Sequence, residues 1–329
     1  MCTALSIGYN EHNNFFGRNM DIEYSFGQSV MIVPEGYKYQ NKVTDEIVTN
    51  KRAFIGMGTI IDNHPAMAEA MNKNGLTCAG LNFVEYAYYE DKEVEGKNNI
   101  APYDFIQWVV AGHDTVQEVK EGIKNIELIN VPIKEGVPVA SLHWMVTDKT
   151  GESIVVEKTK TGIRVYDNTV GVLTNNPEFS WHLTNLNEYI NLSSSQPEDG
   201  KWSNRQLKPL GVGAGTKGIP GDFGSVSRFV RAAYIRANAT KINSDIEAVT
   251  QFFNMLDYVK MVKGGVITKQ GLEDITLYSS CMDQGNAVYY YKTYNNNRIR
   301  AIKMNNENLK SENIKVFSYS DEQDIHYQN

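Results

Sequence analysis

Cys2 is the residue of this sequence best suited to covalent chemistry, because it directly follows the initiator methionine. Cysteine is small enough at the second position for the methionine to be trimmed, and we expect Met1 to be removed. Cys2 would then carry both a thiol and a free α-amine. A thiol has a pKa of about 8.5 and an α-amine a pKa of about 7.7–8.0. The amine can therefore accept the thiol proton near neutral pH, so that one residue supplies a nucleophile and its base.

Two charged residues are predicted to lie beside Cys2. Alternating apolar residues after Cys2 predict a strand, the polar cluster 10–14 predicts a turn near His12, and the residues that follow predict a returning strand. This hairpin would bring Arg18 and Asp21 next to the thiol and the amine. A guanidinium lowers the pKa of a thiol, and a carboxylate holds and orients an ammonium. The arrangement favours an activated nucleophile over the alternative, a merely buried N-terminal cysteine.

Asn82 and Asn175 are candidates for stabilising an oxyanion. Acyl transfer requires neutral hydrogen-bond donors near the developing charge, and a carboxamide provides them without titrating. The alternative for such an asparagine is a role in a turn. Arg228 is expected on a helix that begins after Gly224, where it shares one side of the helix with Arg231. The alternative for Arg228 is a solvated helix face.

One motif resembles a phosphate-binding loop but lacks its context. Residues 213–218 have the pattern G-x-G-x-x-G, yet they neither follow a strand nor open a helix, and a phosphate cradle needs both. The six histidines show no H-E-x-x-H spacing, and the sequence contains no Cys-x-x-Cys pair. We therefore expect no metal site.

Composition excludes several classes of function. The net charge is −7 and the basic residues are scattered, so nothing in the sequence indicates binding to nucleic acid or to an anionic membrane. No apolar run approaches the roughly 18 residues needed to span a bilayer, and the N-terminus lacks the pattern of a signal peptide. The three cysteines, Cys2, Cys78 and Cys281, show no paired spacing. These features fit a reducing cytoplasm.

The elements that would position the candidate residues form two strand-dense blocks, each next to helices. We predict strands at residues 29–33, 53–57, 76–83, 142–147, 153–157, 163–166, 171–173, 275–279, 287–294 and 298–303. We predict helices at residues 66–74, 102–111, 115–126 with Asp114 as N-cap, 225–236 and 246–262. Residues 191–224 are rich in Ser, Pro and Gly and form a long excursion with a functional or interfacial role. The blocks indicate an α+β fold, with two sheets stacked face to face and helices outside, in a single domain over residues 1–329.

Five motifs in order give the chain a resemblance to the choloylglycine hydrolase family, which contains bile salt hydrolases and penicillin V acylases. The motifs are Met1-Cys2-Thr3, Gly17-Arg18-Asn19-Met20-Asp21, Gly80-Leu81-Asn82, Val172-Leu173-Thr174-Asn175-Asn176-Pro177, and Gly218-Ile219-Pro220-Gly221-Asp222 through Ser227-Arg228-Phe229. The resemblance implies an N-terminal nucleophile hydrolase with a four-layer αββα sandwich. It also implies a cytoplasmic homotetramer that needs no cofactor, with residues 191–224 as the assembly loop.

The resemblance further implies a role for each candidate residue. It makes Cys2 the nucleophile with its α-amine as base, and it makes Arg18 and Asp21 the residues that hold the thiol and the amine. It assigns the oxyanion hole and the charged shell to the other three candidates, Asn82, Asn175 and Arg228.

The substrate implied by the resemblance is a glycine- or taurine-conjugated bile salt, whose amide the Cys2 thiolate would attack to form a thioester. Within the family, an asparagine at position 82 goes with bile salt hydrolases, whereas several penicillin acylases carry tyrosine there. Penicillin V acylase remains the alternative, and an inactive ligand-binding member would require Met1 to remain. Apolar walls are expected for the steroid. The residues expected to form them are Met20, Ile22, Phe26, Ile61, Phe83, Ile133 and Val137.

Overall fold

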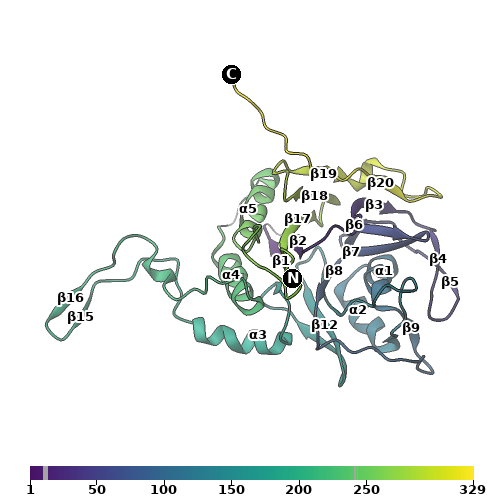
Figure 1. Ribbon diagram of the computed structural model, residues 1–329, viewed down its shortest axis with the longest axis horizontal. Coiled ribbons are helices and arrows are strands. Elements are labelled where there is room, and N and C mark those ends of the chain that lie inside the picture. The colour runs from purple at the N-terminus through teal and green to yellow at the C-terminus, as the bar shows by residue number, and fades with distance from the viewer. Residues whose placement is uncertain (10–13, 241, 243) are drawn as a thin grey trace.

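Two large antiparallel sheets form the centre of the protein. The computed structural model describes residues 1–9, 14–240, 242 and 244–329. The sheets lie face to face, and helices cover both outer faces (Figure 1). The predicted α+β fold, a four-layer αββα sandwich, is therefore confirmed.

The first sheet carries the N-terminus, and its six strands follow the order β14-β1-β2-β17-β18-β19. The strands are β1 (Cys2–Gly8), β2 (Asn14–Ile22), β14 (Val172–Leu173), β17 (Ile275–Asp283), β18 (Val288–Thr293) and β19 (Arg300–Lys303). Strands β2 and β17 approach closely at Gly17, where a Cβ atom would come within 2.0 Å of the Ser280 carbonyl oxygen. The position directly before Arg18 therefore requires a glycine.

The second sheet has eight strands in the order β13-β12-β11-β8-β7-β6-β3-β20. The strands are β3 (Ser29–Val33), β6 (Phe54–Ile61), β7 (His64–Asn72), β8 (Thr77–Asn82), β11 (Leu142–Thr147), β12 (Ser153–Thr159), β13 (Gly162–Asp167) and β20 (Lys315–Phe317). Every neighbouring pair in this sheet is antiparallel.

Helices form the two outer layers (Figure 1). A 3₁₀ turn at Pro102–Asp104 leads into α1 (Phe105–Gly112), which packs against β7 and β8 of the second sheet and is followed by α2 (Val116–Gly122). On the first sheet, α4 (Ser225–Asn238) packs against β1 and β14, and α5 (Asp245–Asp257) packs against β2 and β17. The short helix α3 (Phe179–Asn185) follows β14.

Alternation along the strands produces two apolar cores. Successive side chains of a strand point to opposite faces of its sheet. In β11, Met145 therefore belongs to the core that includes α4 and α5, whereas Trp144 belongs to the core under α1. Burying both faces of the second sheet in this way explains why β3, with the sequence Ser-Val-Met-Ile-Val, is almost continuously apolar.

Three small two-stranded sheets lie outside the sandwich. They are β4 (Lys38–Gln40) with β5 (Ile47–Thr49), β9 (Asn98–Ile100) with β10 (Ile126–Leu128), and β15 (Gly200–Trp202) with β16 (Arg205–Leu207). The β15–β16 hairpin belongs to the 191–224 excursion and extends far from the two sheets (Figure 1). Apolar side chains are exposed on this excursion, with exposed fractions of 78% for Trp202 and 100% for Val212. In the part of the chain that the structure describes, no helix combines the length and apolar character needed to cross a bilayer.

Two predictions of local structure are wrong. Residues 66–74 do not form a helix, because 66–72 belong to strand β7. Ala, Met and Glu favour helices in isolation, but pairing with β6 on one side and β8 on the other decides the conformation. The N-cap of α2 is Thr115, whose hydroxyl accepts a hydrogen bond from the Glu118 amide at 3.1 Å, and not Asp114, which pairs with Arg52.

Candidate active site

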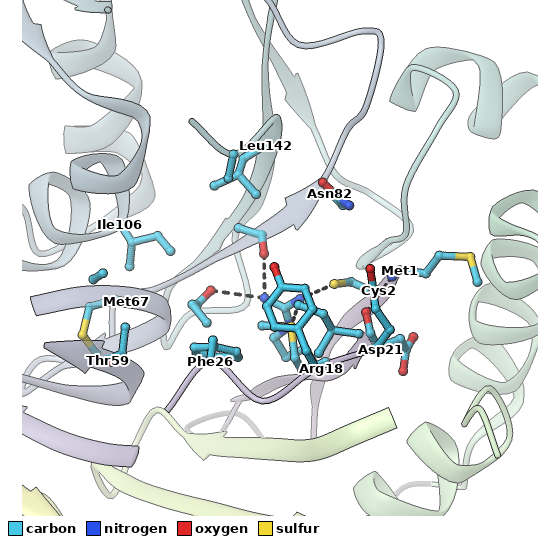
Figure 2. Close-up of a pocket in the computed structure, with 18 residues that line it drawn as sticks. Met1, Cys2, Arg18, Asp21, Phe26, Thr59, Met67, Asn82, Ile106 and Leu142 are labelled. Carbon is cyan, nitrogen blue, oxygen red and sulfur yellow. Dashed lines mark hydrogen bonds between the residues drawn. The ribbon is translucent and has the colours of Figure 1, made fainter. Parts of the chain in front are cut away.

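The pairing of β1 with β2 brings Cys2 and Arg18 together. Cys2 lies opposite Met20, and Ala4 lies opposite Arg18. Cys2 and Ala4 point to the same face of the sheet, so Arg18 is a diagonal neighbour of Cys2 on that face. The Arg18 Nη2 atom donates a hydrogen bond to the Cys2 Sγ atom (Figure 2). The two strands of the predicted hairpin are therefore present, whereas its predicted turn near His12 lies outside the described residues.

Arg18 is fully buried and is held from the second sheet. Its Nη1 atom donates to the carbonyl oxygens of Gly80 at 2.6 Å and Ala68 at 3.2 Å. Burial lowers the pKa of Arg18, but the nearby Cys2 and other acidic groups outweigh that effect and raise it above its ordinary value. The guanidinium is therefore a fixed positive charge beside the Cys2 thiol.

Asp21 lies in the same strand as Arg18 and is also buried. Its Oδ1 atom accepts a hydrogen bond from the Thr276 hydroxyl at 2.6 Å. Its Oδ2 atom is buried and has no hydrogen-bond partner among the described residues. Burial raises the pKa of Asp21, and Arg228 and the N-terminal ammonium oppose this effect. The Asp21 carboxyl group thus has one free acceptor close to the start of the chain.

The Met1 ammonium occupies the space next to Asp21. It donates to the backbone carbonyl of Asp21 at 2.6 Å and to the Oδ2 atom of Asp274 at 3.2 Å. The carbonyl of Met1 accepts from the Asp21 amide at 3.0 Å, so Met1 extends the β1–β2 pairing by one residue. Two buried carboxyl groups, Asp21 and Asp274, therefore lie at this end of the chain.

Asn175 and Arg228 hold the backbone of Cys2. The Asn175 Oδ1 atom accepts from the Cys2 amide at 2.9 Å and from the Arg228 Nη2 atom at 2.7 Å. The Arg228 Nη1 atom donates to the Cys2 carbonyl and, at 2.6 Å, to the Thr3 hydroxyl. Arg228 is fully buried, so the solvated alternative for this residue does not hold. With its oxygen engaged, Asn175 directs its NH₂ group away from Arg228.

Asn82 lies at the end of β8 and contacts the NH₂ group of Asn175, whose oxygen contacts Cys2. The Asn175 Nδ2 atom donates to the backbone carbonyl of Asn82 at 2.8 Å. The Asn82 side chain is exposed and lines the cavity in front of Cys2 (Figure 2). No hydrogen bond of this side chain occurs within the described part of the chain, so its NH₂ group is available to a ligand.

Two buried imidazoles fix the segment that carries Asn175. The Nε2 atom of His182 lies 3.0 Å from the Asn175 carbonyl oxygen, and the Nε2 atom of His143 lies 2.9 Å from the Thr174 carbonyl oxygen. Burial lowers the pKa of His182 from 6.5 to about 4. A neutral His182 that carries its proton on Nε2 can donate to the Asn175 carbonyl. The Asn175 side chain is therefore held from its own backbone as well as by Cys2 and Arg228.

A cavity of about 320 Å³ opens in front of Cys2. Cys2, Arg18 and Asp21 gather at one end of it, and Thr59, Met67 and Ile106 lie toward the other (Figure 2). Its remaining lining residues are Met1, Met20, Ile22, Glu23, Tyr24, Phe26, Ala66, Ala68, Gly80, Asn82, Ala140 and Leu142. Most of these side chains are apolar, so the cavity combines a charged end with an apolar body.

The predicted pocket residues divide into two groups. Met20, Ile22 and Phe26 line the cavity, whereas Ile61, Phe83, Ile133 and Val137 do not. Phe83 is fully buried and stacks on His143 with ring centroids 4.3 Å apart, because it follows Asn82 and alternation turns it to the other side. Val137 is exposed, and Ile133 is buried in the loop after β10.

Sequence reasoning missed several buried polar residues of the site. Glu69 lies behind Arg18, with its Oε2 atom 3.8 Å from the Arg18 Nη1 atom, and it accepts hydrogen bonds from the hydroxyls of Tyr278 and Tyr289. Asp274 lies beside the N-terminus. The sequence indicates Glu69 only in that it is a single acidic residue within the apolar segment 66–71. No cluster of three or more His, Cys, Asp or Glu side chains that could hold a metal ion occurs among the described residues.

Comparisons with known proteins identify the family. Residues 2–317 match the family of linear amide C–N hydrolases described as the choloylglycine hydrolase family. The chain belongs to the choloylglycine hydrolase family. It is 46% identical to the "Bile salt hydrolase/transferase" of Clostridium perfringens, with 100% of both chains covered. It is 41% identical to the protein of the same name from Lactiplantibacillus plantarum, with 94% of each chain covered.

Solved structures of the family give the same result. The C2A variant of conjugated bile acid hydrolase from Clostridium perfringens superposes with a TM-score of 0.95 at 45% identity, and the comparison covers 100% of both chains. Penicillin V acylase from Agrobacterium tumefaciens has a TM-score of 0.76 at 21% identity, with 96% of this chain and 90% of that chain covered, and so shares the fold. As a choloylglycine hydrolase family member, the protein is a hydrolase of linear amide bonds.

Proposed function

We propose that the protein is a bile salt hydrolase that cleaves the amide bond of glycine- or taurine-conjugated bile acids through a thioester on Cys2. The observation that carries this proposal is the contact between the Arg18 guanidinium and the Cys2 thiol at the charged end of an apolar cavity. The full-length similarity to proteins named bile salt hydrolases and conjugated bile acid hydrolases supports it.

Removal of Met1 would free the α-amine of Cys2 to act as the base. The amine takes the proton of the thiol and becomes an ammonium. This ammonium can donate a hydrogen bond to the free Oδ2 atom of Asp21. The thiolate remains beside Arg18, whose positive charge stabilises it. Asn175 contacts the Cys2 nitrogen through its Oδ1 atom, so it orients the amine toward the thiol.

The thiolate attacks the carbonyl carbon of the amide and forms a tetrahedral oxyanion. The NH₂ groups of Asn175 and Asn82 lie near Cys2 and can donate to this oxygen. The ammonium gives its proton to the amide nitrogen, the C–N bond breaks, and the glycine or taurine leaves. The amine then takes a proton from water, the resulting hydroxide attacks the thioester, and the bile acid leaves as Cys2 becomes free again.

The shape of the cavity supports a steroid as the acyl part of the substrate. The apolar side chains of Met67 and Ile106 line the end of the cavity away from Cys2, whereas Arg18 and Asp21 lie near Cys2. A conjugated bile acid has the matching division, because its ring system is apolar and the amide lies near its anionic end. Asn82 supports the same choice over penicillin V, because an asparagine leaves the mouth of the cavity wider than a tyrosine would.

A hydrolysis panel tests the substrate. The kcat/KM values for glycocholate, taurocholate and penicillin V are measured with one enzyme batch, together with the Cys2→Ala variant as a blank. We expect both bile salts to be cleaved faster than penicillin V. A clear preference for penicillin V would overturn the substrate and leave the Cys2 mechanism in place.

The excursion at 191–224 is proposed to assemble the protein into a homotetramer in the cytoplasm. It extends from the sandwich and exposes Trp202, Leu210 and Val212, three large apolar side chains on one segment. Exposed apolar side chains that are grouped in this way mark a protein–protein contact.

A further inference from the structure

Glu69 connects the two sheets directly behind Arg18. It lies in β7 of the second sheet and is fully buried. Its Oε2 atom accepts from the hydroxyl of Tyr278 at 2.8 Å, and its Oε1 atom accepts from the hydroxyl of Tyr289 at 2.7 Å. Both tyrosines belong to the first sheet, in β17 and β18. Neither the family roles nor the mechanism above uses this cluster.

The hydrogen bonds and the ion pair of Glu69 match its ionised form. Both carboxyl oxygens act as acceptors, which is the arrangement of a carboxylate. Among the described residues, Arg18 is its only ion-pair partner, with 3.8 Å between the Arg18 Nη1 atom and the Glu69 Oε2 atom. Burial raises the pKa of Glu69 above its ordinary value, and Arg18 and the two tyrosine hydroxyls oppose this effect without cancelling it. The negative charge of Glu69 therefore depends on Arg18.

Arg18 thus lies between two acidic groups. Its Nη2 atom faces the Cys2 thiol, and its Nη1 atom faces Glu69 and the carbonyl oxygen of Ala68, the residue before it. In a buried site the interaction between charges is stronger than in water. A carboxylate behind the guanidinium therefore reduces the stabilisation that Arg18 gives to a thiolate in front of it.

We propose that Glu69 is a positioning residue that limits how strongly Arg18 favours the Cys2 thiolate. The chemical advantage is that the nucleophilicity of a thiolate falls as its basicity falls, and the best attacking thiol titrates near the ambient pH. An Arg18 without a counter-charge would produce a more stable but less reactive thiolate. The inference rests on the proposed role of Cys2 as nucleophile, but not on the identity of the substrate.

Other charged and titratable groups surround Cys2. They are Arg18 and Asp21 in β2, Tyr278 in β17, Arg228 in α4, Asp274 before β17, and the N-terminal amine. Behind them, Tyr289 in β18 is next to Tyr278, and His182 in α3 is next to Arg228. Glu69→Gln keeps the shape of the side chain, removes its charge and leaves the other charged groups unsubstituted.

The test is the pH dependence of Cys2 alkylation in Glu69→Gln. The rate of reaction with iodoacetamide is measured from pH 4 to pH 10, and peptide mapping separates Cys2 from the fully buried Cys78 and Cys281. We expect the midpoint of the profile to move to lower pH by about one unit, because a charge within about 4–6 Å shifts such an equilibrium by roughly 1–3 units and Glu69 acts from behind Arg18. We expect the plateau rate at high pH to fall about threefold, because a less basic thiolate is less nucleophilic.

Two comparisons separate this effect from a loss of structure. Asp104→Asn removes another buried carboxyl group, one that pairs with His64 and does not line the cavity, and it should leave the profile unchanged. In the Arg18→Leu background, Glu69 loses the cation that keeps it ionised, and burial then favours the neutral acid. Glu69→Gln should therefore cause no further shift in that background.

The proposal is overturned if the midpoint of Glu69→Gln stays unchanged or moves to higher pH, or if the same shift occurs in the Arg18→Leu background. If Glu69→Gln does not fold, Glu69→Asp replaces it. The shorter side chain moves the carboxylate away from Arg18, so a smaller shift in the same direction is expected, and an unchanged profile would again overturn the proposal. Alkylation needs no substrate, so failure of the bile salt assignment would be seen separately in the hydrolysis panel.

Discussion

Arg18→Lys tests whether the shape of the guanidinium, and not its charge alone, activates Cys2. Arg18 donates to the Cys2 Sγ atom, to the Gly80 carbonyl at 2.6 Å and to the Ala68 carbonyl at 3.2 Å. A lysine ammonium keeps the charge but cannot reproduce the planar fork of donors. We therefore expect the substitution to lower activity strongly.

The size of the effect follows from the contacts that are lost. A hydrogen bond to a charged group contributes about 1.5–3 kcal/mol, and each 1.36 kcal/mol changes a rate about tenfold. If the lysine leaves the thiolate without its donor, kcat should fall about 10- to 150-fold. Leaving a buried carbonyl unpaired costs about 1–3 kcal/mol of stability, so the melting temperature should fall as well.

The assay is kcat at saturating glycocholate, with thermal unfolding measured on the same preparations. Arg52→Lys is the matched control, because Arg52 forms an ion pair with Asp114 that is partly exposed and does not line the cavity. Its kcat should stay within about twofold of the wild type, since exposed pairs contribute about 0–1 kcal/mol. A near-normal kcat for folded Arg18→Lys would refute the reasoning, because the charge alone would then be sufficient.

Three further predictions concern the nucleophile, the support of Asn175 and the assembly. Cys2→Ser should nearly abolish turnover, whereas Cys78→Ser should retain most of it, because Cys78 is fully buried and burial raises its pKa. Equal losses of activity in two folded variants would contradict the choice of Cys2 as the nucleophile. Burial lowers the pKa of His182 to about 4, so below pH 6.5 the unfolded chain binds a proton that the folded chain does not bind. The free energy of unfolding is therefore unaffected by this residue above pH 6.5 and decreases as the pH falls from 6.5 toward 4. Between pH 7 and pH 5, urea unfolding should therefore show a loss about 2 kcal/mol larger in the wild type than in His182→Gln, and identical losses would contradict the assignment. Trp202→Glu combined with Leu210→Glu should convert the proposed tetramer into smaller species in light scattering while the melting curve keeps one transition, and an unchanged mass would contradict a role of the excursion in assembly.

The pairing of the strands that carry Cys2 and Arg18 could be predicted from the sequence because its signals are local. The alternation after Cys2 and the polar cluster at 10–14 fix two neighbouring strands, and the spacing then brings Arg18 beside Cys2. Nothing beyond this hairpin was needed to find that pair. The layered fold was likewise accessible, because strands and helices are grouped into blocks along the chain.

Residues contributed by distant strands could not be predicted in the same way. Tyr278 and Glu69 are hydrogen-bonded across 209 positions of the chain, and no local pattern indicates which strands meet there. The segment around Glu69 also has the composition of a helix, and its strand conformation comes from pairing with β6 and β8. Phe83 shows a different limit, because the prediction of a pocket wall there ignored the alternation that turns it away from Asn82.

The central claim is that Cys2, as the N-terminal residue, forms the covalent intermediate. The most direct measurement is acid quenching of the enzyme during turnover of glycocholate, followed by mass spectrometry of the peptides. The account predicts a choloyl group on a peptide that begins at Cys2 and lacks Met1. A choloyl group on any other residue, or on a peptide that still carries Met1, would contradict it.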